Sequence, residues 1–498
     1  MSGMRQREHH WDRIRTTEEW DVVIIGGGAS GLGIAVHAAS SGLKTALFER
    51  DDFAKGTSSK STKLIHGGVR YLQQGNIKLV KESLRERGLL MQNAPHLVQN
   101  MKFVLPTFKP WRTWYYALGL KVYDRLAGRL GLGRSESLSK EETVALLPGI
   151  KTDEIAGGAS YHDGQFDDAY LALSLAKTAV HHGAALLNYC EVTSFISVNK
   201  RIQGVEVHSP LDAEKRNVRA RFVINATGPF SDSMMALDNP KHKPVIKPSQ
   251  GTHVVVDSSF FPGNTAMLIP KTDDGRILFA VPWHGKIILG TTDTPVDAAS
   301  AEPVPFDSEI DFILTHLQRY LRHAPQRTDV LSAFSGIRPL VKLTNKKTAE
   351  LARDHVIRVS RSGLISILGG KWTTYRKMAA DVMRKIQSLS SEKIALSDTR
   401  MLRLVDCNTP PLSPSIENMN DAELKERIRL EVEQSACLTV EDFLARRTRQ
   451  LLLDARHAIK RAPFIATCLA EQLIRDETWK SEQVESFNAL AQLYLPQD

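Results

Sequence analysis

The sequence predicts an α/β fold of three parts, and three observations carry this prediction. Apolar runs alternate with helical patterns through the first half of the 498 residues, which is typical of a parallel sheet covered by helices. Between about residues 245 and 292 the segments become short, β-branched and separated by turn residues, which indicates an antiparallel sheet. Beyond a Pro-rich stretch at 408–414 the patterns are almost wholly helical, which predicts a C-terminal all-helical domain.

Individual elements can be assigned in each part. The helical domain is expected to hold a helix capped by Thr439 with Asp442, followed by amphipathic helices at 448–459 and 463–476. The predicted strands of the parallel sheet are 21–25, 45–49, 222–225 and 364–368, and those of the antiparallel sheet are 252–256, 276–281 and 286–289.

Composition narrows the class of protein. Lys and Arg total 65 against 56 Asp and Glu, a formal charge of +9 that favours anionic partners, unless it is only a generally basic surface. The four cysteines form no C-x-x-C pair and indicate reduced thiols in a cytoplasmic protein, with no metal site. Residues 1–20 do not resemble a signal peptide, and no segment approaches the ~20 apolar residues of a membrane span. Any membrane contact should therefore be peripheral.

The most specific local motif is a strand followed by G-x-G-x-x-G and a helix, with Gly26, Gly28 and Gly31 as its glycines and Ala29 and Ser30 between them. Such glycines allow a pyrophosphate to approach the backbone at the positive end of the helix. Glu49 ends the next predicted strand, at about the spacing of 20 residues at which an acid binds a ribose 2′-hydroxyl. This Rossmann pattern predicts FAD or NAD and disfavours NADP, whose 2′-phosphate the carboxylate would repel.

Two later segments favour FAD over NAD. Thr227 and Gly228 end a buried strand in a way that resembles the return strand of two-domain flavoproteins. Gly370, Lys371 and a helix start at Thr373 and Thr374 follow a third strand, and a helix N-terminus there would stabilise the negative charge of reduced flavin.

The predicted strands and motifs divide the chain into domains. We expect a discontinuous FAD/dinucleotide-binding domain at 17–100, 148–244 and 331–390. An antiparallel-sheet domain that binds substrate is expected at 101–147 and 245–330, and the C-terminal helical domain at 408–498.

A polar, basic segment lies at 56–71. Its hydroxyls, glycines and cations suit a phosphate and a flavin ring, although a solvated basic loop would have the same composition. The residues expected to contact the cofactor here are Thr57, Ser58, Ser59, Lys63, Leu64 and His66.

From Ser61 to Leu72 the sequence resembles the signature of the FAD-dependent sn-glycerol-3-phosphate dehydrogenases of the quinone-linked, aerobic type. The resemblance covers nearly the whole chain. It continues at Trp283, at Gly290–Asp293, at Ser335–Pro339, at Gly369–Arg376, and in the helical domain at 444–448 and 453–456.

The resemblance implies roles for individual residues. His253 would lie beside the flavin and is the first choice for the catalytic base, with His66 in reserve, while Arg338 would stabilise the developing alkoxide. Arginine guanidinium groups from separate segments suit a phosphate dianion. The implied substrate contacts are Arg70, Tyr71, Thr291, Arg338, Arg353, Lys371 and Thr373.

One position departs from the family pattern. The family often has an arginine after Asp-Asp-Ala, where this chain has Tyr170. This departure weakens any site role at that position.

The reaction implied is oxidation of glycerol 3-phosphate to dihydroxyacetone phosphate by hydride transfer from C2 to FAD, with the electrons passed to a membrane quinone. A glycerophosphate oxidase that reduces O2 to H2O2, and a non-catalytic flavin-binding sensor or scaffold, are the alternatives. No nucleic-acid partner is expected, because no nucleic-acid fold signature occurs. Assembly is left open, with a homodimer as one option.

The resemblance also implies a location, on the cytoplasmic side and peripheral to the inner face of the cell membrane. A basic amphipathic segment within 101–134 supports this expectation. Its apolar face is predicted to hold Tyr115, Leu118, Val122, Leu126 and Leu130, flanked by Lys121, Arg125 and Arg129, with Trp111 and Trp114 at its start.

Overall fold

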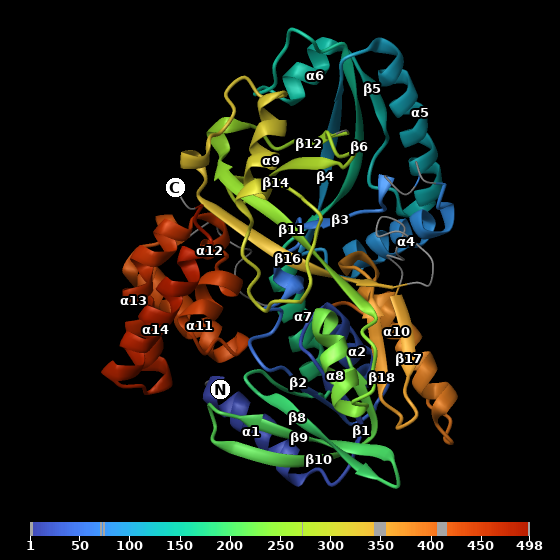
Figure 1. The fold of residues 1–498 in the computed structure, drawn as a ribbon, viewed down its shortest axis with the longest axis vertical. Coiled ribbons are helices and arrows are strands. Elements are labelled where there is room, and N and C mark those ends of the chain that lie inside the picture. The colour runs from blue at the N-terminus through green and yellow to red at the C-terminus, as the bar shows by residue number, and fades with distance from the viewer. Residues whose placement is uncertain are drawn as a thin grey trace.

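The fold consists of two large sheets and a lateral bundle of helices. It is known from a computed structural model, which describes residues 3–69, 72, 75–270, 272–342, 355–405 and 416–496. In Figure 1 the first sheet and its helices occupy the lower half, the second sheet occupies the upper half, and the C-terminal helices lie along one side of both. The three predicted parts are therefore present.

The first sheet has the order β17-β18-β10-β1-β2-β7, and all of its neighbouring strands are parallel except β17. These strands are β1 (Trp20–Ile25), β2 (Thr45–Phe48), β7 (Ala185–Leu187), β10 (Glu214–Asn225), β17 (His355–Val359) and β18 (Ile365–Gly369). The four strands predicted for this sheet are confirmed.

Helices cover one face of this sheet, and an antiparallel extension covers the other. The helices are α2 (Ala29–Ser40), α7 (Asp168–His181) and α10 (Tyr375–Leu389), and their apolar sides form one core with β1. On the opposite face, α1 (Gly3–Thr16) packs its Trp11 and Ile14 against a core shared with β8 (Glu191–Val198) and β9 (Arg201–Ser209). α8 (Ser231–Asp238) follows β10.

The second sheet has ten strands, with β11 (Ile246–Asp257) pairing with both β14 and β16. Its other strands are β3 (Leu64–Ile65), β4 (Val98–Thr107), β5 (Glu136–Leu138), β6 (Gly157–Phe166), β12 (Ala266–Ile269), β13 (Leu278–Trp283), β14 (Lys286–Gly290), β15 (Thr294–Pro295) and β16 (Ser332–Val341). Its helices are α4 (Ile77–Asn93), α5 (Pro110–Ala127), α6 (Lys140–Leu146) and α9 (Asp307–Gln318).

Sheet membership differs from the expected domain division at three strands. The segments that form β3, β6 and β16 fall within the ranges expected for the dinucleotide-binding domain, but all three strands lie in the second sheet. β6 pairs with β4 over ten residues, and β16 pairs with β11 over ten. Strand pairing between distant segments decides which sheet a strand joins, and a local hydrophobic pattern does not report it.

The C-terminal domain is helical, as predicted. It contains α11 (Asp421–Ser435), a π-helical turn (Asp442–Arg447), α12 (Gln450–Leu453), α13 (Ala455–Leu473) and α14 (Glu477–Gln492). The predicted cap is confirmed, because the Asp442 N–H donates to Thr439 Oγ1 at 3.1 Å and the Thr439 N–H donates to the Asp442 carboxylate at 3.1 Å. The Pro-rich stretch at 408–414 lies outside the described residues.

The predicted helix boundaries in this domain are wrong at Pro463. This proline lies inside α13 instead of starting a helix. Ala462, Ile465, Ala466 and Leu469 are all fully buried on the same side of α13. Packing of this continuous apolar face outweighs the backbone hydrogen bond that proline removes.

Within the part of the chain that the structure describes, no helix combines the length and the hydrophobicity of a membrane span. The same residues contain no group of His, Cys, Asp and Glu side chains arranged to hold a metal ion.

Candidate active site

The predicted glycine motif forms the tight turn between β1 and α2. Gly26 has φ +104°, and a Cβ atom on it would lie 2.8 Å from the Ala226 carbonyl oxygen at the end of β10. A Cβ atom on Gly31 would lie 1.9 Å from the Gly26 carbonyl oxygen. Only glycine therefore fits both positions, and the turn brings the positive N-terminal end of α2 to the place where an anion would lie.

Glu49 lies beside this turn, at the end of β2. Its carboxylate accepts from the Gly27 N–H at 2.6 Å and from the Asp51 N–H at 2.9 Å. Burial raises the pKa of Glu49, although both backbone hydrogen bonds oppose the shift. The carboxylate is thus fixed against the glycine turn, where a ribose would lie.

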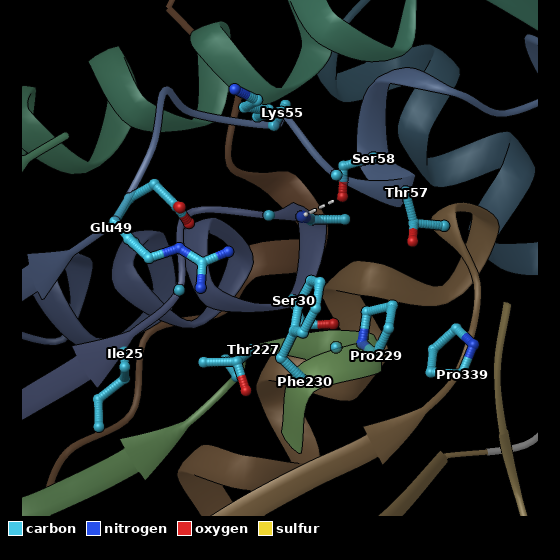
Figure 2. A pocket seen from close by; sticks show the side chains of 18 of the residues that line it. Ile25, Ser30, Glu49, Lys55, Thr57, Ser58, Thr227, Pro229, Phe230 and Pro339 are labelled. Carbon is cyan, nitrogen blue, oxygen red and sulfur yellow. Dashed lines mark hydrogen bonds between the residues drawn. The ribbon is translucent and has the colours of Figure 1, made fainter. Parts of the chain in front are cut away.

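A first cavity extends from this turn and is shown in Figure 2. Ser58 Oγ accepts from the Ala29 N–H at 3.0 Å, at the first turn of α2, and Thr57 Oγ1 donates to the Ile337 carbonyl at 2.6 Å. The lining of this cavity includes predicted cofactor residues from five segments: Gly26, Gly28, Ala29, Ser30, Glu49, Thr57, Ser58, Thr227, Gly228, Gly370 and Lys371.

A second cavity continues from the first. Both are lined by Thr57, Pro339, Gly370, Lys371 and Trp372, so together they form one elongated space that runs from the first sheet toward the second. The second cavity is also lined by Thr62, Leu64, His66, His253, Arg338 and Thr373. An extended dinucleotide fits this arrangement, with its nucleotide end at β1 and its ring at the second sheet.

A third cavity meets the second on its far side. Thr62, Leu64, His66 and Arg338 line both. The third cavity alone is lined by Phe103, Tyr161, Arg276, Phe279, Thr291 and Asp293, among others. It therefore combines aromatic walls with two arginines, and opens onto the place where a ring in the second cavity would lie.

Arg338 lies at the junction of the second and third cavities, on β16. Its guanidinium donates to Asp293 Oδ1 at 3.1 Å and to Thr291 Oγ1 at 3.1 Å. Because two partners hold the guanidinium in place, it is oriented before a substrate arrives.

His253 is almost fully buried on β11. Its Nε2 lies 2.9 Å from Thr62 Oγ1, and its ring stacks on Phe334 with 4.9 Å between centroids. Burial lowers the pKa of His253 well below its usual value, and the cations of Lys63 and Arg338 add to the shift. The imidazole is therefore neutral near pH 7.

Comparison with known proteins assigns this arrangement to a family. Residues 21–376 match the family described as FAD dependent oxidoreductase. The chain is 38% identical to the mitochondrial glycerol-3-phosphate dehydrogenase of Rattus norvegicus over 542 aligned residues, which cover 96% of this chain and 74% of that protein. The chain belongs to the FAD-dependent oxidoreductases, in the glycerol-3-phosphate dehydrogenase family.

Other relatives and solved structures agree. A mitochondrial glycerol-3-phosphate dehydrogenase of Arabidopsis thaliana is 44% identical over 377 residues, covering 73% of this chain and 60% of that protein. The crystal structure of glycerol-3-phosphate dehydrogenase from Bacillus halodurans, complexed with FAD, superposes with a TM-score of 0.79 at 28% identity and covers 99% of this chain and 98% of that one. L-α-glycerophosphate oxidase from Mycoplasma pneumoniae shares the fold, with a TM-score of 0.59 at 20% identity, covering 78% and 98%.

The residues of this family member fit its FAD cofactor. Side chains at Gly26 and Gly31 would collide with backbone, so the glycine turn leaves room for a pyrophosphate. The Glu49 carboxylate lines the same cavity and suits a ribose hydroxyl. The segment Gly370–Lys371 lines both the first and the second cavity, next to the predicted flavin position.

Some predicted cofactor residues lie elsewhere. Lys63 was expected to contact the cofactor, but its Nζ lies in a buried ion pair with Asp168 at 2.8 Å. Ser59 and Thr374 are buried, with hydroxyls directed to the carbonyls of Lys55 and Lys371. Gly31 acts through backbone packing. A buried cation without a partner would be strongly destabilising, and this explains why the Lys63 side chain lies where it can pair with Asp168.

Three predicted substrate residues, Arg70, Tyr71 and Arg353, lie outside the described residues. Val69, next to Arg70, lines the third cavity.

Arg276 in the third cavity was missed by the sequence analysis. It follows a Thr-Asp-Asp-Gly turn in which its N–H donates to Thr272 Oγ1 at 2.9 Å and to Asp274 Oδ1 at 3.0 Å. In the sequence it is the first residue of the predicted strand 276–281. A cation between a tight polar turn and a strand was the available signal.

Tyr170, the departure from the family pattern, is buried at the contact between α7 and the helical domain. Its hydroxyl donates to the Arg447 carbonyl at 2.5 Å and lies 3.1 Å from Glu431 Oε1, while Arg427 donates to it. The position therefore joins two domains and lies away from the glycine turn.

Proposed function

We propose that this protein oxidises glycerol 3-phosphate to dihydroxyacetone phosphate. The observation that carries the proposal is the junction of the second and third cavities, where His66 and Arg338 line both spaces and Arg276 lines only the outer one. A small phosphorylated alcohol suits this layout, with its phosphate toward Arg276 and its reacting carbon toward the flavin side.

The side chains have separate roles in this proposal. FAD, when bound, supplies the acceptor for the two electrons. Arg276 binds the phosphate oxygens, and the outer walls of Phe103 and Phe279 limit the access of water. Arg338 stabilises the charge that develops on the C2 oxygen as its proton leaves, since Asp293 and Thr291 already orient the guanidinium.

We propose His66, in place of His253, as the base that takes the proton of the C2 hydroxyl. His66 lines both the second and the third cavity, whereas His253 lines only the second, on the flavin side. The Nε2 atom of His253 lies beside Thr62. An imidazole that faces the reacting carbon can accept a proton near neutral pH. His253 then serves to position Thr62, which lines both cavities.

Single-turnover kinetics test this assignment. His66→Asn should slow flavin reduction by about 100-fold or more. It should also abolish the pH dependence of that rate that deprotonation of the catalytic base produces. His253→Asn should keep that pH dependence, with a smaller loss. If His253→Asn removes the pH dependence and His66→Asn retains it, the assignment of the base is wrong.

We further propose that the electrons pass to a membrane quinone. The support lies on α5, where an apolar face remains exposed: Trp111 is 60% exposed, Trp114 is 69% exposed and Leu118 is 50% exposed. Lys121, Arg125 and Arg129 are also exposed on this helix and the turn after it. An apolar face with flanking cations suits an anionic membrane surface. Leu126 and Leu130, predicted on the same face, are half-buried against the protein.

Vesicle flotation tests the membrane contact. Replacing Trp114 and Leu118 by Ser should abolish flotation with anionic vesicles and leave glycerol 3-phosphate oxidation with a soluble quinone analogue unchanged. Leu237→Ser, at an exposed leucine on α8, serves as the matched control. Undiminished flotation of the α5 variant would contradict the proposal, as would an equal loss in the control.

Turnover measurements test the reaction itself and its acceptor. With glycerol 3-phosphate and a quinone analogue, dihydroxyacetone phosphate should form without air. In air, without quinone, the yield of H2O2 should be small. Stoichiometric H2O2 would identify a glycerophosphate oxidase, and absence of any product with either acceptor would indicate a non-catalytic flavin-binding protein.

The proposed location follows from the membrane contact: peripheral, on the inner face of the cell membrane. A homodimer remains part of the proposal, to be tested by light scattering.

A further inference from the structure

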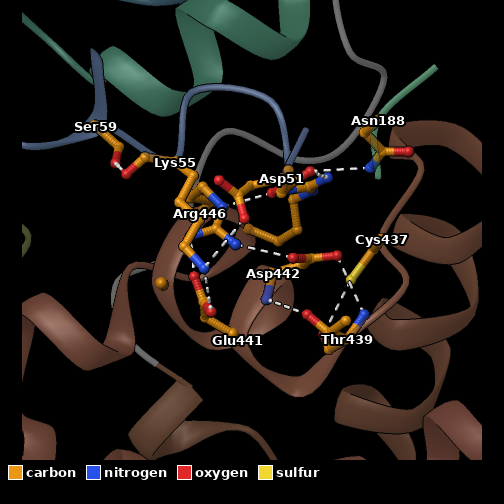
Figure 3. Close-up of polar contacts among 12 residues, drawn as sticks. Asp51, Lys55, Ser59, Asn188, Cys437, Thr439, Glu441, Asp442 and Arg446 are labelled. Carbon is orange, nitrogen blue, oxygen red and sulfur yellow. Dashed lines mark hydrogen bonds and ion pairs between the residues drawn. The ribbon is translucent and has the colours of Figure 1, made fainter. Parts of the chain in front are cut away.

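Three arginines of the C-terminal domain extend into the FAD-binding domain. Arg446 and Arg447 end the π-helical turn, and Arg449 lies just before α12. All three side chains are almost fully buried. Figure 3 shows Arg446 between Glu441 and Asp442 of the helical domain, on one side, and the loop that carries Asp51 and Lys55, on the other.

Arg446 and Arg447 bind the loop that follows Glu49. Arg447 donates to both oxygens of Asp52, at 2.5 and 3.0 Å, and Arg446 donates to the same carboxylate. Burial alone would raise the pKa of Asp52, but the two guanidinium groups outweigh it and hold the pKa below its usual range. The carboxylate is therefore charged and held by a two-point contact.

The loop held by Asp52 contacts the glycine turn. The Ala54 N–H donates to the Gly27 carbonyl at 3.0 Å, and the Lys55 N–H donates to the Asp52 carbonyl at 3.1 Å. Ala54 and Lys55 line the first cavity, as does Glu49. The contact of Arg447 with Asp52 thus supports the nucleotide end of the FAD site.

Arg449 binds a later part of the same segment, at Ser59, and the aspartate Asp168 at the start of α7. It donates to Asp168 Oδ1 at 2.8 Å and to the Ser59 carbonyl at 2.9 Å. Asp168 in turn accepts from the Ser61 N–H at 3.0 Å and from Lys63 Nζ at 2.8 Å. Burial, followed by the charge of Arg449, lowers the pKa of Lys63 to about 7, against the opposing charge of Asp168.

This later part of the segment forms a wall of the flavin-side cavity, through Lys60, Ser61 and Thr62. Arg449 therefore contacts Asp168, and Asp168 contacts Ser61 in this wall. The contact supports the flavin end of the site, at Ser59 and the residues after it, whereas Arg447 holds the same segment at Asp52.

The backbone that presents these arginines is unusual. Arg449 has φ +61°, in the left-handed region that a non-glycine residue seldom adopts. It follows a six-residue π-helical turn, Asp442–Arg447, a rare form that is frequent at functional sites. Backbone of this kind persists where surrounding contacts enforce it. Here those contacts are the two aspartates of the FAD-binding domain.

We propose that these arginines are positioning residues that hold the two ends of FAD separately: Arg447, with Arg446, the nucleotide end through Asp52, and Arg449 the flavin end through Asp168. The helical domain thereby contributes to cofactor retention and to the flavin environment, in addition to packing. The proposal rests on FAD binding alone and does not depend on which alcohol is oxidised.

A merely structural role predicts a different pattern. If the arginines only joined two domains, each substitution would lower stability and loosen FAD in proportion. Two separate contacts predict a polarised result, because Ala54 and Lys55 line the first cavity and Lys60, Ser61 and Thr62 line the second.

The test uses Arg447→Met and Arg449→Met in the full chain, with Arg429→Met as control. Arg429 belongs to the same domain and pairs with Glu426 and Glu433 on the exposed side of α11. Four quantities are measured without substrate: the Kd of FAD for the apoprotein, the midpoint potential of bound flavin, its visible spectrum, and the melting temperature.

We expect Arg447→Met to raise the Kd at least tenfold with an unchanged potential. Arg449→Met should change the ratio of the Kd values for oxidised and reduced FAD about tenfold, which is a shift of ~30 mV in the midpoint potential of a two-electron couple. It should also alter the visible spectrum of the bound flavin. Arg429→Met should have the Kd of FAD and the midpoint potential of the wild type. Lysine at 447 should restore little, because it cannot bind Asp52 at two points.

Equal effects of both substitutions on Kd and potential, scaled to the loss of melting temperature, would overturn the proposal, as would wild-type values in both. If either methionine variant is recovered unfolded, the lysine variant at that position takes its place and the same two outcomes decide. Because glycerol 3-phosphate is absent throughout, failure here leaves the proposed reaction untouched, and the reverse also holds.

Discussion

The two ends of the active site are built differently. At the nucleotide end, the turn from Gly26 to Gly31 and Glu49 come from one contiguous segment, and the backbone geometry of this turn shapes the cavity to which other segments add walls. At the substrate end, Arg276, Arg338 and His66 come from three separate parts of the chain, and side chains make the site. Sites built from a local backbone can be found in one sequence, whereas sites assembled from distant side chains require the fold.

This contrast predicts the largest effect at the nucleotide end. Gly31→Ala should abolish FAD binding, because the new Cβ would lie 1.9 Å from the Gly26 carbonyl oxygen and the turn would have to open. Flavin absorbance of the purified protein measures this. Gly119→Ala, in α5 with open space around it, should keep full flavin content. A flavin-loaded Gly31→Ala protein would refute the backbone account of this end.

A large kinetic effect with normal flavin content is expected at the junction. Arg338→Lys removes the fork that binds Thr291 and Asp293, and should slow flavin reduction by about 100- to 1,000-fold. Stopped-flow measurement of flavin reduction gives the rate. A rate within threefold of wild type, or loss of FAD, would show that Arg338 does not act on the reacting oxygen.

A weaker effect, confined to binding, is expected in the outer cavity. Arg276→Gln should raise the KM for glycerol 3-phosphate by about 10- to 100-fold, since a charge-assisted hydrogen bond contributes about 1.5–3 kcal/mol, and leave the limiting rate nearly unchanged.

The matched control for Arg276 is Arg319→Gln, a half-exposed arginine paired with Asp273 in the neighbouring turn. Its KM should stay at the wild-type value. An unchanged KM in Arg276→Gln, or an equal rise in both variants, would place the phosphate elsewhere.

The smallest effect concerns stability. His253 has a folded-state pKa well below 6.5, so the unfolded chain binds a proton that the folded chain does not. The contribution of neutral His253 to the free energy of unfolding is fully present above about pH 6.5. It is lost as the pH falls toward the folded-state pKa, by about 1.4 kcal/mol per pH unit. His253→Gln should weaken the acid dependence of the urea midpoint between pH 7 and 5.5. An identical dependence in both proteins would show that His253 is not buried in its neutral form.

Much of the fold could be predicted from the sequence. β1, β2 and β18 agree with the predicted strands to within one residue at every end, because their apolar runs are bounded by glycines and polar residues. The sheet membership of β6 and β16 could not be predicted, because it depends on pairing with strands far away in sequence.

The same reason explains why the partners of individual site residues could not be predicted. Lys63 lies in a segment rich in hydroxyls and glycines that suited an anionic cofactor, yet Asp168, 105 residues away, pairs with it, and Arg449 completes the cluster. Arg276 follows a polar turn, but this turn alone does not place it in the cavity, which forms only when β13 joins the second sheet. Side-chain partners across such distances leave no local pattern.

The most direct measurement of the central claim is an anaerobic titration of the purified yellow protein with glycerol 3-phosphate. We predict that the visible absorbance of oxidised flavin bleaches, with one dihydroxyacetone phosphate formed per FAD, and that glycerol at the same concentration produces no bleaching. A flavin that dithionite reduces but glycerol 3-phosphate does not would contradict the account.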